Sequence, residues 1–270
     1  MRQVSRLPSP PLPGTLLKAS VSDLVKDVNQ WSAKIETLQA VVQFQATALL
    51  TQEGLEKQYH QIRAYILLKK PSLIRIQGEA PVVGTEIFDM ASNGSEFRLS
   101  IPPKNQFITG ADNYHATKSG GLENLRPRHI LEALLVAPLG PTDNYFVEET
   151  NRNGQDYYVL TVVKPAENHT LKLVRKIWFD RTDLRVKRSE IFGADGKLEE
   201  AVNYSGYGDF QGISYPSHIE LSRPVEGYAL GIQFERATFN EEIGPEKFVL
   251  PRPPHAKLIR LGQSSGGNSQ

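Results

Sequence analysis

The sequence predicts a mainly β protein: one large, strongly curved antiparallel sheet, or half-open barrel, of about 11–13 strands with two or three helices over its concave face. Apolar residues recur at every second position through most of the chain, which is typical of strands with one wet side. Turn signals join these strands in sequence, and helical stretches are too few to connect parallel strands.

The clearest pattern lies in residues 171–207, which predict an antiparallel meander of three strands. Ile177 and Phe179 share the apolar face of its first strand. Asp195-Gly196 separates the next two, and this dipeptide predicts a two-residue type I′ hairpin because both central residues of that turn need a positive φ.

The first element is an amphipathic helix over residues 20–38, where apolar residues recur every three or four positions. Ser20 is its expected N-cap, and Asp23 lies near the positive end of the helix dipole. From Leu38 the period changes to two and predicts a long strand. The apolar stripe of the helix therefore needs a sheet to pack against.

A second, shorter helix is expected to begin at Pro127, a favourable first-turn residue, and to end before Pro138. Asn93-Gly94 predicts a hairpin turn. The remaining strands are expected over residues 59–69, 73–78, 85–91, 96–101, 105–109, 144–150, 157–163, 213–222 and 230–239.

A single domain is predicted for residues 20–262. The proline-rich residues 1–19 predict an extended N-terminal tether or a disordered end, since proline fixes φ and removes hydrogen-bond donors. Residues 263–270 predict a disordered tail without core-forming residues. No stretch reaches the roughly 20 apolar residues that span a bilayer, and no apolar signal-peptide region follows Met1.

Composition argues against several classes of function. A net charge of +1 argues against a nucleic-acid partner, and the absence of cysteine excludes disulfides and thiol catalysis. The six histidines have no metal-site spacing, and no nucleophile elbow or phosphate loop is present. Neighbouring carboxylates such as Glu148-Glu149 point to opposite faces of a strand. We expect no enzyme activity, no metal and no cofactor.

The long apolar faces admit two interpretations. Either they pack in a closed core beneath the helices, or the curved sheet leaves a cavity that binds an apolar small molecule such as an acyl chain. The cavity walls would be Val42, Phe44, Ile62, Ile66, Ile74, Ile76, Phe97, Leu99, Ile177, Phe179, Ile232 and Phe234, with Trp31 and Leu134 in the helical cover.

Arg188 is the further candidate for ligand binding. It follows Leu184 and Val186 in the alternation, which predicts an inward side chain, although exposure at a strand end is the commoner arrangement. An inward arginine needs a partner because an unpaired buried charge is costly. That partner would be a backbone carbonyl of the helical cover or the head group of a ligand.

The order of elements resembles the LolA/LolB-type lipoprotein localisation factors and related envelope lipoproteins, from roughly Ser20 to Leu261. A single amphipathic helix precedes a long strand, and a helix lies in the middle of the chain. The motifs that carry the resemblance are Lys70-Pro71-Ser72-Leu73-Ile74-Arg75-Ile76, the hairpin Asp89 to Gly94, Trp178-Phe179-Asp180, Leu184-Arg185-Val186, Asp195-Gly196 and Phe248-Val249-Leu250-Pro251.

This resemblance implies a half-open barrel whose apolar interior holds lipid or lipoprotein acyl chains, in a periplasmic protein or one tethered to the outer membrane through a lipidated N-terminal cysteine. The chain as given has no cysteine, and we expect Met1 to replace the lipidated residue or to follow it. Two functions remain open: an envelope carrier or acceptor of acyl chains, and a structural or interaction lipoprotein with a filled core and an envelope protein partner.

Overall fold

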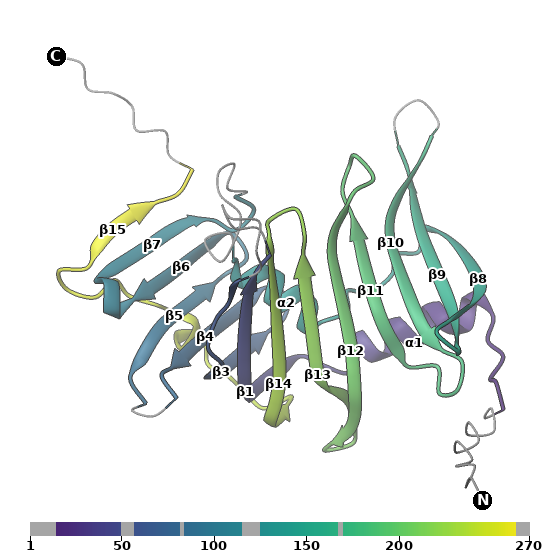
Figure 1. Ribbon diagram of the computed structural model, residues 1–270, viewed down its shortest axis with the longest axis horizontal. Coiled ribbons are helices and arrows are strands. Elements are labelled where there is room, and N and C mark those ends of the chain that lie inside the picture. Colours follow the sequence, from purple (N-terminus) through teal and green to yellow (C-terminus); the bar gives the residue numbers. More distant parts are fainter. Residues whose placement is uncertain (1–14, 50–56, 82–83, 115–124, 167–169, 263–270) are drawn as a thin grey trace, which may run out of the picture.

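The computed structural model describes residues 15–49, 57–81, 84–114, 125–166 and 170–262 (Figure 1). Residues 1–14 of the predicted tether and the whole predicted tail lie outside the described residues. The predicted extent of the single domain therefore stays a prediction at its two ends.

The strands divide into those before and those after residues 112–143. The earlier strands are β1 (Thr37–Ala48), β2 (Lys57–Gln58), β3 (Ile62–Lys69), β4 (Leu73–Glu79), β5 (Glu86–Ser92), β6 (Glu96–Ile101) and β7 (Gln106–Ala111). The later strands are β8 (Asn144–Arg152), β9 (Gln155–Pro165), β10 (Leu171–Asp180), β11 (Val186–Phe192), β12 (Leu198–Phe210), β13 (Ile213–Arg223), β14 (Tyr228–Phe239) and β15 (Lys257–Arg260).

These strands form one 15-stranded sheet, in the order β15-β7-β6-β5-β4-β3-β1-β14-β13-β12-β11-β10-β9-β8, with β2 paired only to β1. Pairing is antiparallel except between β15 and β7, which run parallel. The chain steps outward from β1 to β7, crosses to the far edge at β8, and steps back until β14 pairs with β1. This return makes β1 and β14 the junction of two halves.

We call β3–β7 and β15 the first half and β8–β13 the second half. The mainly β, antiparallel class is confirmed. The expected strong curvature is not confirmed, because the sheet is neither closed nor strongly curled (Figure 1). Barrel closure requires the two edge strands to meet and pair. Here β15 extends the β7 edge instead of pairing with β8.

The helices α1 (Val21–Ala33) and α2 (Pro127–Leu134) lie on the same face of the sheet, which we call the inner face (Figure 1). The predicted cap of α1 is confirmed, since the backbone N–H of Asp23 donates to Ser20 Oγ at 3.2 Å and Ser20 N–H donates to Asp23 Oδ2 at 2.9 Å. In Figure 1, α1 runs behind the second half, whereas α2 crosses behind the middle of the sheet. The helix α2 begins at Pro127 as predicted.

The main hydrophobic core lies between the helices and the inner face. Leu24 and Val28 of α1 and Ile130 and Leu134 of α2 are fully or almost fully buried in it. The strand residues that meet them alternate with outward-facing polar residues, as the period of two predicts. In the first half, the inner-face core residues are Ala64, Ile66, Leu68, Ile74, Ile76 and Met90.

Residues 240–256, which we call the C-terminal segment, cross the opposite, outer face of the first half and include the short 3-10 helix η4 (Pro245–Phe248). Side chains from β1, β3, β4 and β6 donate in turn to its carbonyls. These hydrogen bonds run from Thr37 to Glu241 at 2.6 Å, from Lys69 to Ile243 at 3.0 Å, from Arg75 to Lys247 at 2.9 Å and from Arg98 to Leu250 at 3.3 Å. Leu250 and Ala256 of this segment and Ala91 and Phe107 of the sheet form a second, smaller apolar cluster.

The turn between β11 and β12 differs from the prediction. Of its two central residues only Gly196 has a positive φ, of 76°, so the predicted type I′ turn is wrong. Gly193 N–H donates to Lys197 O at 2.9 Å, which closes a three-residue loop with glycine in the left-handed position. Glycine is still required there, although the register of the hairpin is different.

Candidate functional site

A cleft with a volume of about 430 Å³ opens on the inner face of the second half. It lies between α2, the segment 137–143 that follows this helix, and strands β9–β12. Its volume is within the range of about 300–1,000 Å³ typical of small-molecule sites. The cleft is therefore the candidate functional site.

The floor of the cleft is apolar. It consists of Val162 of β9, Val174 of β10, Ile191 of β11 and Val202 of β12. The register of these strands places Arg175 between Val162 and Ile191, Glu200 beside Ile191 and Ser189 beside Val202. An apolar group that lies on these side chains therefore has polar groups next to it.

Arg175 interrupts this floor. It lies two residues before the fully buried Ile177, on the inner face of β10, and its cross-strand neighbours are Val162 and Ile191. Its guanidinium donates from Nε to Ser189 Oγ at 3.2 Å and from Nη1 to the carbonyl of Ala137 at 2.8 Å. Burial lowers the pKa of this guanidinium, because the charged form loses its hydration.

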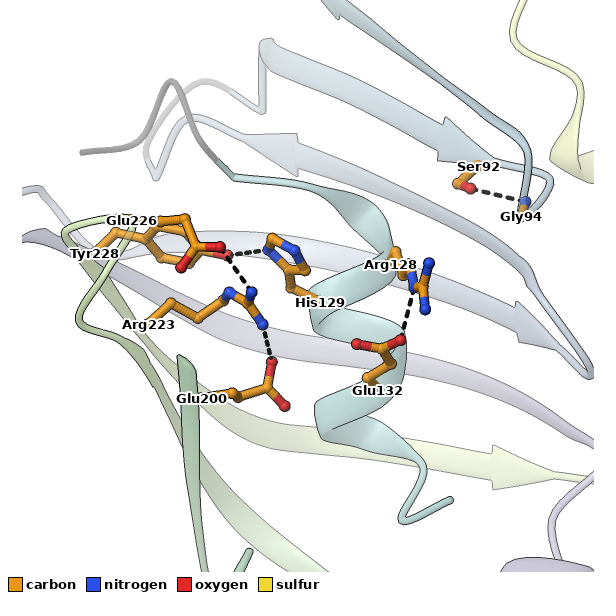
Figure 2. A network of polar contacts seen from close by, with 9 residues as sticks. All are labelled: Ser92, Gly94, Arg128, His129, Glu132, Glu200, Arg223, Glu226 and Tyr228. Carbon is orange, nitrogen blue, oxygen red and sulfur yellow. Dashed lines mark hydrogen bonds and ion pairs between the residues drawn. The ribbon is translucent and has the colours of Figure 1, made fainter. Parts of the chain in front are cut away.

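A buried ion-pair cluster contributes Glu200 and Arg223 to the lining of the cleft (Figure 2). Arg223 of β13 bridges two carboxylates, with 2.7 Å from Nη1 to Glu200 Oε2 and 2.7 Å from Nη2 to Glu226 Oε1. Burial raises the pKa of Glu200 to about 7, although the Arg223 charge acts in the opposite direction. The second half thus holds a carboxylate that titrates near neutrality.

The helix α2 is tied to the sheet by three polar contacts. His129 Nδ1 lies 2.5 Å from the hydroxyl of Tyr228, as Figure 2 shows. The hydroxyl of Tyr204 donates to the carbonyl of Ala133 at 3.1 Å, and that of Tyr215 donates to Leu134 at 2.8 Å. These two bonds satisfy carbonyls that the end of a helix leaves without an intrahelical partner.

Two polar atoms that belong to cleft-lining residues remain without a hydrogen bond in the described part of the chain. They are Asp112 Oδ1 and Arg223 Nε, and both residues are more than nine-tenths buried. Buried polar groups normally have partners, so a site with spare polar capacity next to an apolar floor suits an amphipathic ligand or ordered water.

No protein-family model matches the chain, and no curated protein matches it. Solved structures do match it. A LolA superfamily protein from Nitrosomonas europaea is 13% identical with a TM-score of 0.51, over 84% of this chain and 97% of its own. A DUF1329 family protein from Desulfovibrio piger is also 13% identical, with a TM-score of 0.54, over 85% of this chain and 95% of its own.

The chain has a LolA-like fold. At this level of identity the similarity establishes the fold alone, so the function still has to be argued from the cleft. The resemblance predicted from the order of elements and short motifs is confirmed.

The LolA-like fold places the predicted cavity-wall residues in its closed core. Buried there are Val42, Phe44, Ile66, Ile74, Ile76, Phe97, Leu134, Ile177, Phe179, Ile232 and Phe234. Partly buried against the same core are Trp31, Ile62 and Leu99. None of them lines the cleft, which is built from other residues of the inner face. Their contact with a ligand stays a prediction.

Arg188 does not point inward. A β-bulge shifts the register of β10 and β11, so that Val186 faces Phe179 but Arg188 faces Trp178 on the outer face. There Arg188 donates to Glu190 at 2.8 Å and to Asn203 at 2.8 Å. Arg175 on the neighbouring strand does point inward, and it contacts a backbone carbonyl in the segment after α2, the kind of partner expected for Arg188.

The sequence carried a signal for the cleft that pattern analysis missed. Polar residues interrupt the apolar face of three successive strands at Arg175, Ser189 and Glu200. On α2, Arg128 and Glu132 form an i,i+4 ion pair of 2.7 Å on the side that lines the cleft. Such interruptions on neighbouring strands predict a polar opening in the core.

No group of three or more histidine, aspartate or glutamate side chains in the described ranges is placed to hold a metal ion. No helix in those ranges combines the length and apolar character needed to cross a membrane.

Proposed function

We propose that this LolA-like protein is a lipoprotein-sorting-type carrier or acceptor of the bacterial envelope that binds acyl chains of a lipid or lipoprotein. The observation that supports it best is the cleft with an apolar floor on the helix-covered face of a LolA-like sheet. A periplasmic location, with a tether to the outer membrane, belongs to the same proposal.

The acyl chain would lie on Val162, Val174, Ile191 and Val202. Contact with the predicted wall residues, such as Ile177 and Phe179, would require α1 or α2 to move away from the inner face, because these side chains are fully buried beneath the helices. The cleft is where such a chain can enter without disrupting the core.

The closed core favours a second candidate function. With the predicted wall residues buried, the protein would act as a structural or interaction lipoprotein that binds an envelope protein partner. This candidate needs no ligand in the cleft, so a search for bound lipid separates the two.

The test is native mass spectrometry of protein purified without detergent, followed by extraction with organic solvent. We expect a stoichiometric adduct of acyl-chain mass. A bare mass that stays bare after incubation with phospholipids and lipopeptides contradicts acyl binding and favours the interaction protein.

Two matched variants locate the site. Ile191→Asp places a charge on the cleft floor and is expected to abolish the adduct. Phe146→Asp places the same charge on the outer face of β8, where Phe146 is 56% exposed, and is expected to retain the adduct. Loss of the adduct in both variants, or in neither, would place the acyl chain elsewhere.

A further inference from the structure

Arg175 differs from the other lysine and arginine side chains that line the cleft. Each of the others has a carboxylate partner: Arg128 has Glu132 at 2.7 Å, Lys164 has Asp143 at 3.4 Å, and Arg223 has Glu200 at 2.7 Å. Within the described chain, Arg175 forms no ion pair, and its hydrogen-bond partners are a hydroxyl and a backbone carbonyl, both neutral. Glu200 and Glu132 act on it only through longer-range attraction.

An arginine in this position stays charged, because its guanidinium does not lose its proton in proteins. Arg175 is half-buried among apolar residues, and such burial without an anion is costly. Its hydrogen bonds to Ser189 and Ala137 use two of the five N–H donors, so donors remain for an anion. Such a charge-assisted hydrogen bond is stronger than one between neutral groups.

The surroundings of Arg175 limit what that anion can be. Its two cross-strand neighbours, Val162 and Ile191, and the preceding Val174 belong to the apolar floor. A ligand that reaches the guanidinium therefore lays its remaining atoms on apolar side chains. Asp112 and Glu199 also line the cleft and form no ion pair with described residues, which disfavours ligands with more than one anionic group.

We propose that the cleft selects an amphipathic anion, an acyl chain that ends in a single carboxylate or phosphate group, with the anionic group bound by Arg175 and the chain on the valine and isoleucine floor. This inference rests on the proposed function, and it adds the chemistry of the head group. Carboxylate and phosphate share the geometry that a guanidinium recognises, so the experiment separates these two sources.

The experiment is isothermal titration calorimetry on the full chain with three ligands of equal chain length, each below its critical micelle concentration: dodecanoate, dodecyl phosphate and dodecan-1-ol. At least one anion is expected to bind about 10- to 100-fold more tightly than the alcohol. The tighter of the two anions identifies the head group. Acetate and inorganic phosphate are expected to bind far more weakly, because they leave the apolar floor uncovered.

The variant Arg175→Gln is expected to bring the affinity for the anion down to that for the alcohol, a loss of about 10- to 100-fold. Arg188→Gln is the matched control, since it removes the same charge from the outer face of the neighbouring strand, and its affinities are expected to equal those of the unmodified protein. Arg175→Lys keeps the charge and is expected to retain the preference for the anion. Near-ultraviolet circular dichroism checks that each variant is folded.

Four results would overturn the inference. Equal affinity for anion and alcohol, or an unchanged preference in folded Arg175→Gln, removes the head-group role but leaves acyl binding intact. If acetate or phosphate binds as tightly as the long-chain anion, the apolar floor does not contribute to binding and the ligand need not be amphipathic. Failure of all three long-chain ligands to bind refutes both this inference and the proposed acyl binding.

Discussion

The two halves of the sheet use their inner faces differently. In the first half the inner face of β3 and β4 carries no polar side chain, with Ile66, Ile74 and Ile76 completely buried. In the second half, polar groups such as Arg175 and Glu200 lie on the same face among valines. Both halves face helices, but only the second leaves the cleft open beside α2.

The outer faces of the two halves differ in whether a chain segment covers them. The C-terminal segment covers the first half, held by side chains of four strands and by the apolar cluster around Leu250. On the second half no segment of comparable length crosses the outer face in the described residues, and side chains such as Arg188 pair with one another there. The first half is therefore covered on its outer face, whereas the second half has an uncovered outer face and a cleft on its inner face.

The largest expected effect tests the covered outer face. Leu250→Ala removes a side chain of the C-terminal segment that is 5% exposed against the outer face of the first half, and it is expected to lower the free energy of unfolding by about 2–5 kcal/mol. Phe146→Ala on the outer face of β8 is expected to change it by less than about 0.5 kcal/mol. Chemical denaturation measures both. Similar losses would show that the second half is as well packed as the first.

A smaller effect concerns the charged inner face of the second half. The pKa of Glu200 is raised from 4.5 to about 7, so its stabilising contribution is complete below about pH 4.5 and is lost as pH rises through 7. We expect the free energy of unfolding to fall by about 1–3 kcal/mol between pH 5 and pH 8 from this group, with Arg223, Glu132 and Arg175 as its charged neighbours.

Glu200→Gln is expected to remove this part of the pH dependence, because glutamine does not ionise. Denaturation curves of both proteins at pH 5 and pH 8 measure the difference. An identical fall in stability in Glu200→Gln would assign the pH dependence to other groups.

The smallest effect concerns the attachment of α2 to the second half. Tyr204→Phe removes the hydroxyl that donates to Ala133 and is expected to cost about 1 kcal/mol of unfolding free energy. Tyr65→Phe removes a hydroxyl from the outer face of the first half, where Arg63 stacks on the ring, and is expected to cost less than about 0.5 kcal/mol. Thermal denaturation compares the two variants, and equal losses of unfolding free energy would show that the hydrogen bond from Tyr204 to α2 adds nothing to stability.

Many local features were predictable because they depend on neighbours in the chain. The capping box at Ser20 and Asp23, the start of α2 at Pro127 and the hairpin at Asn93-Gly94 follow from side-chain and backbone chemistry within four residues. The period of two placed nearly every strand. The order of these elements also predicted the LolA-like fold that the solved structures confirm.

The candidate site could not be placed in this way. One extra residue in a strand moves every following side chain to the other face, and both β10 and β11 take part in such shifts. Alternation alone therefore assigned Arg188 to the inner face. Alternation also places Arg175 on the inner face, two residues before Ile177, but only the packing of α2 against the sheet shows that it lies in a cleft. A bulge forms where paired strands adjust to each other, and no single strand encodes it.

The sequence by itself determined the strands, the helices and the apolar stripe of each, because these depend on periods of two and 3.6 residues along the chain. Only the tertiary structure decided that the sheet stays open, that the C-terminal segment covers the first half, and that Arg175 lies in a cleft beside α2. These features depend on pairs of residues far apart in sequence, such as β1 with β14 and β7 with β15, whose contacts form only when the whole sheet assembles.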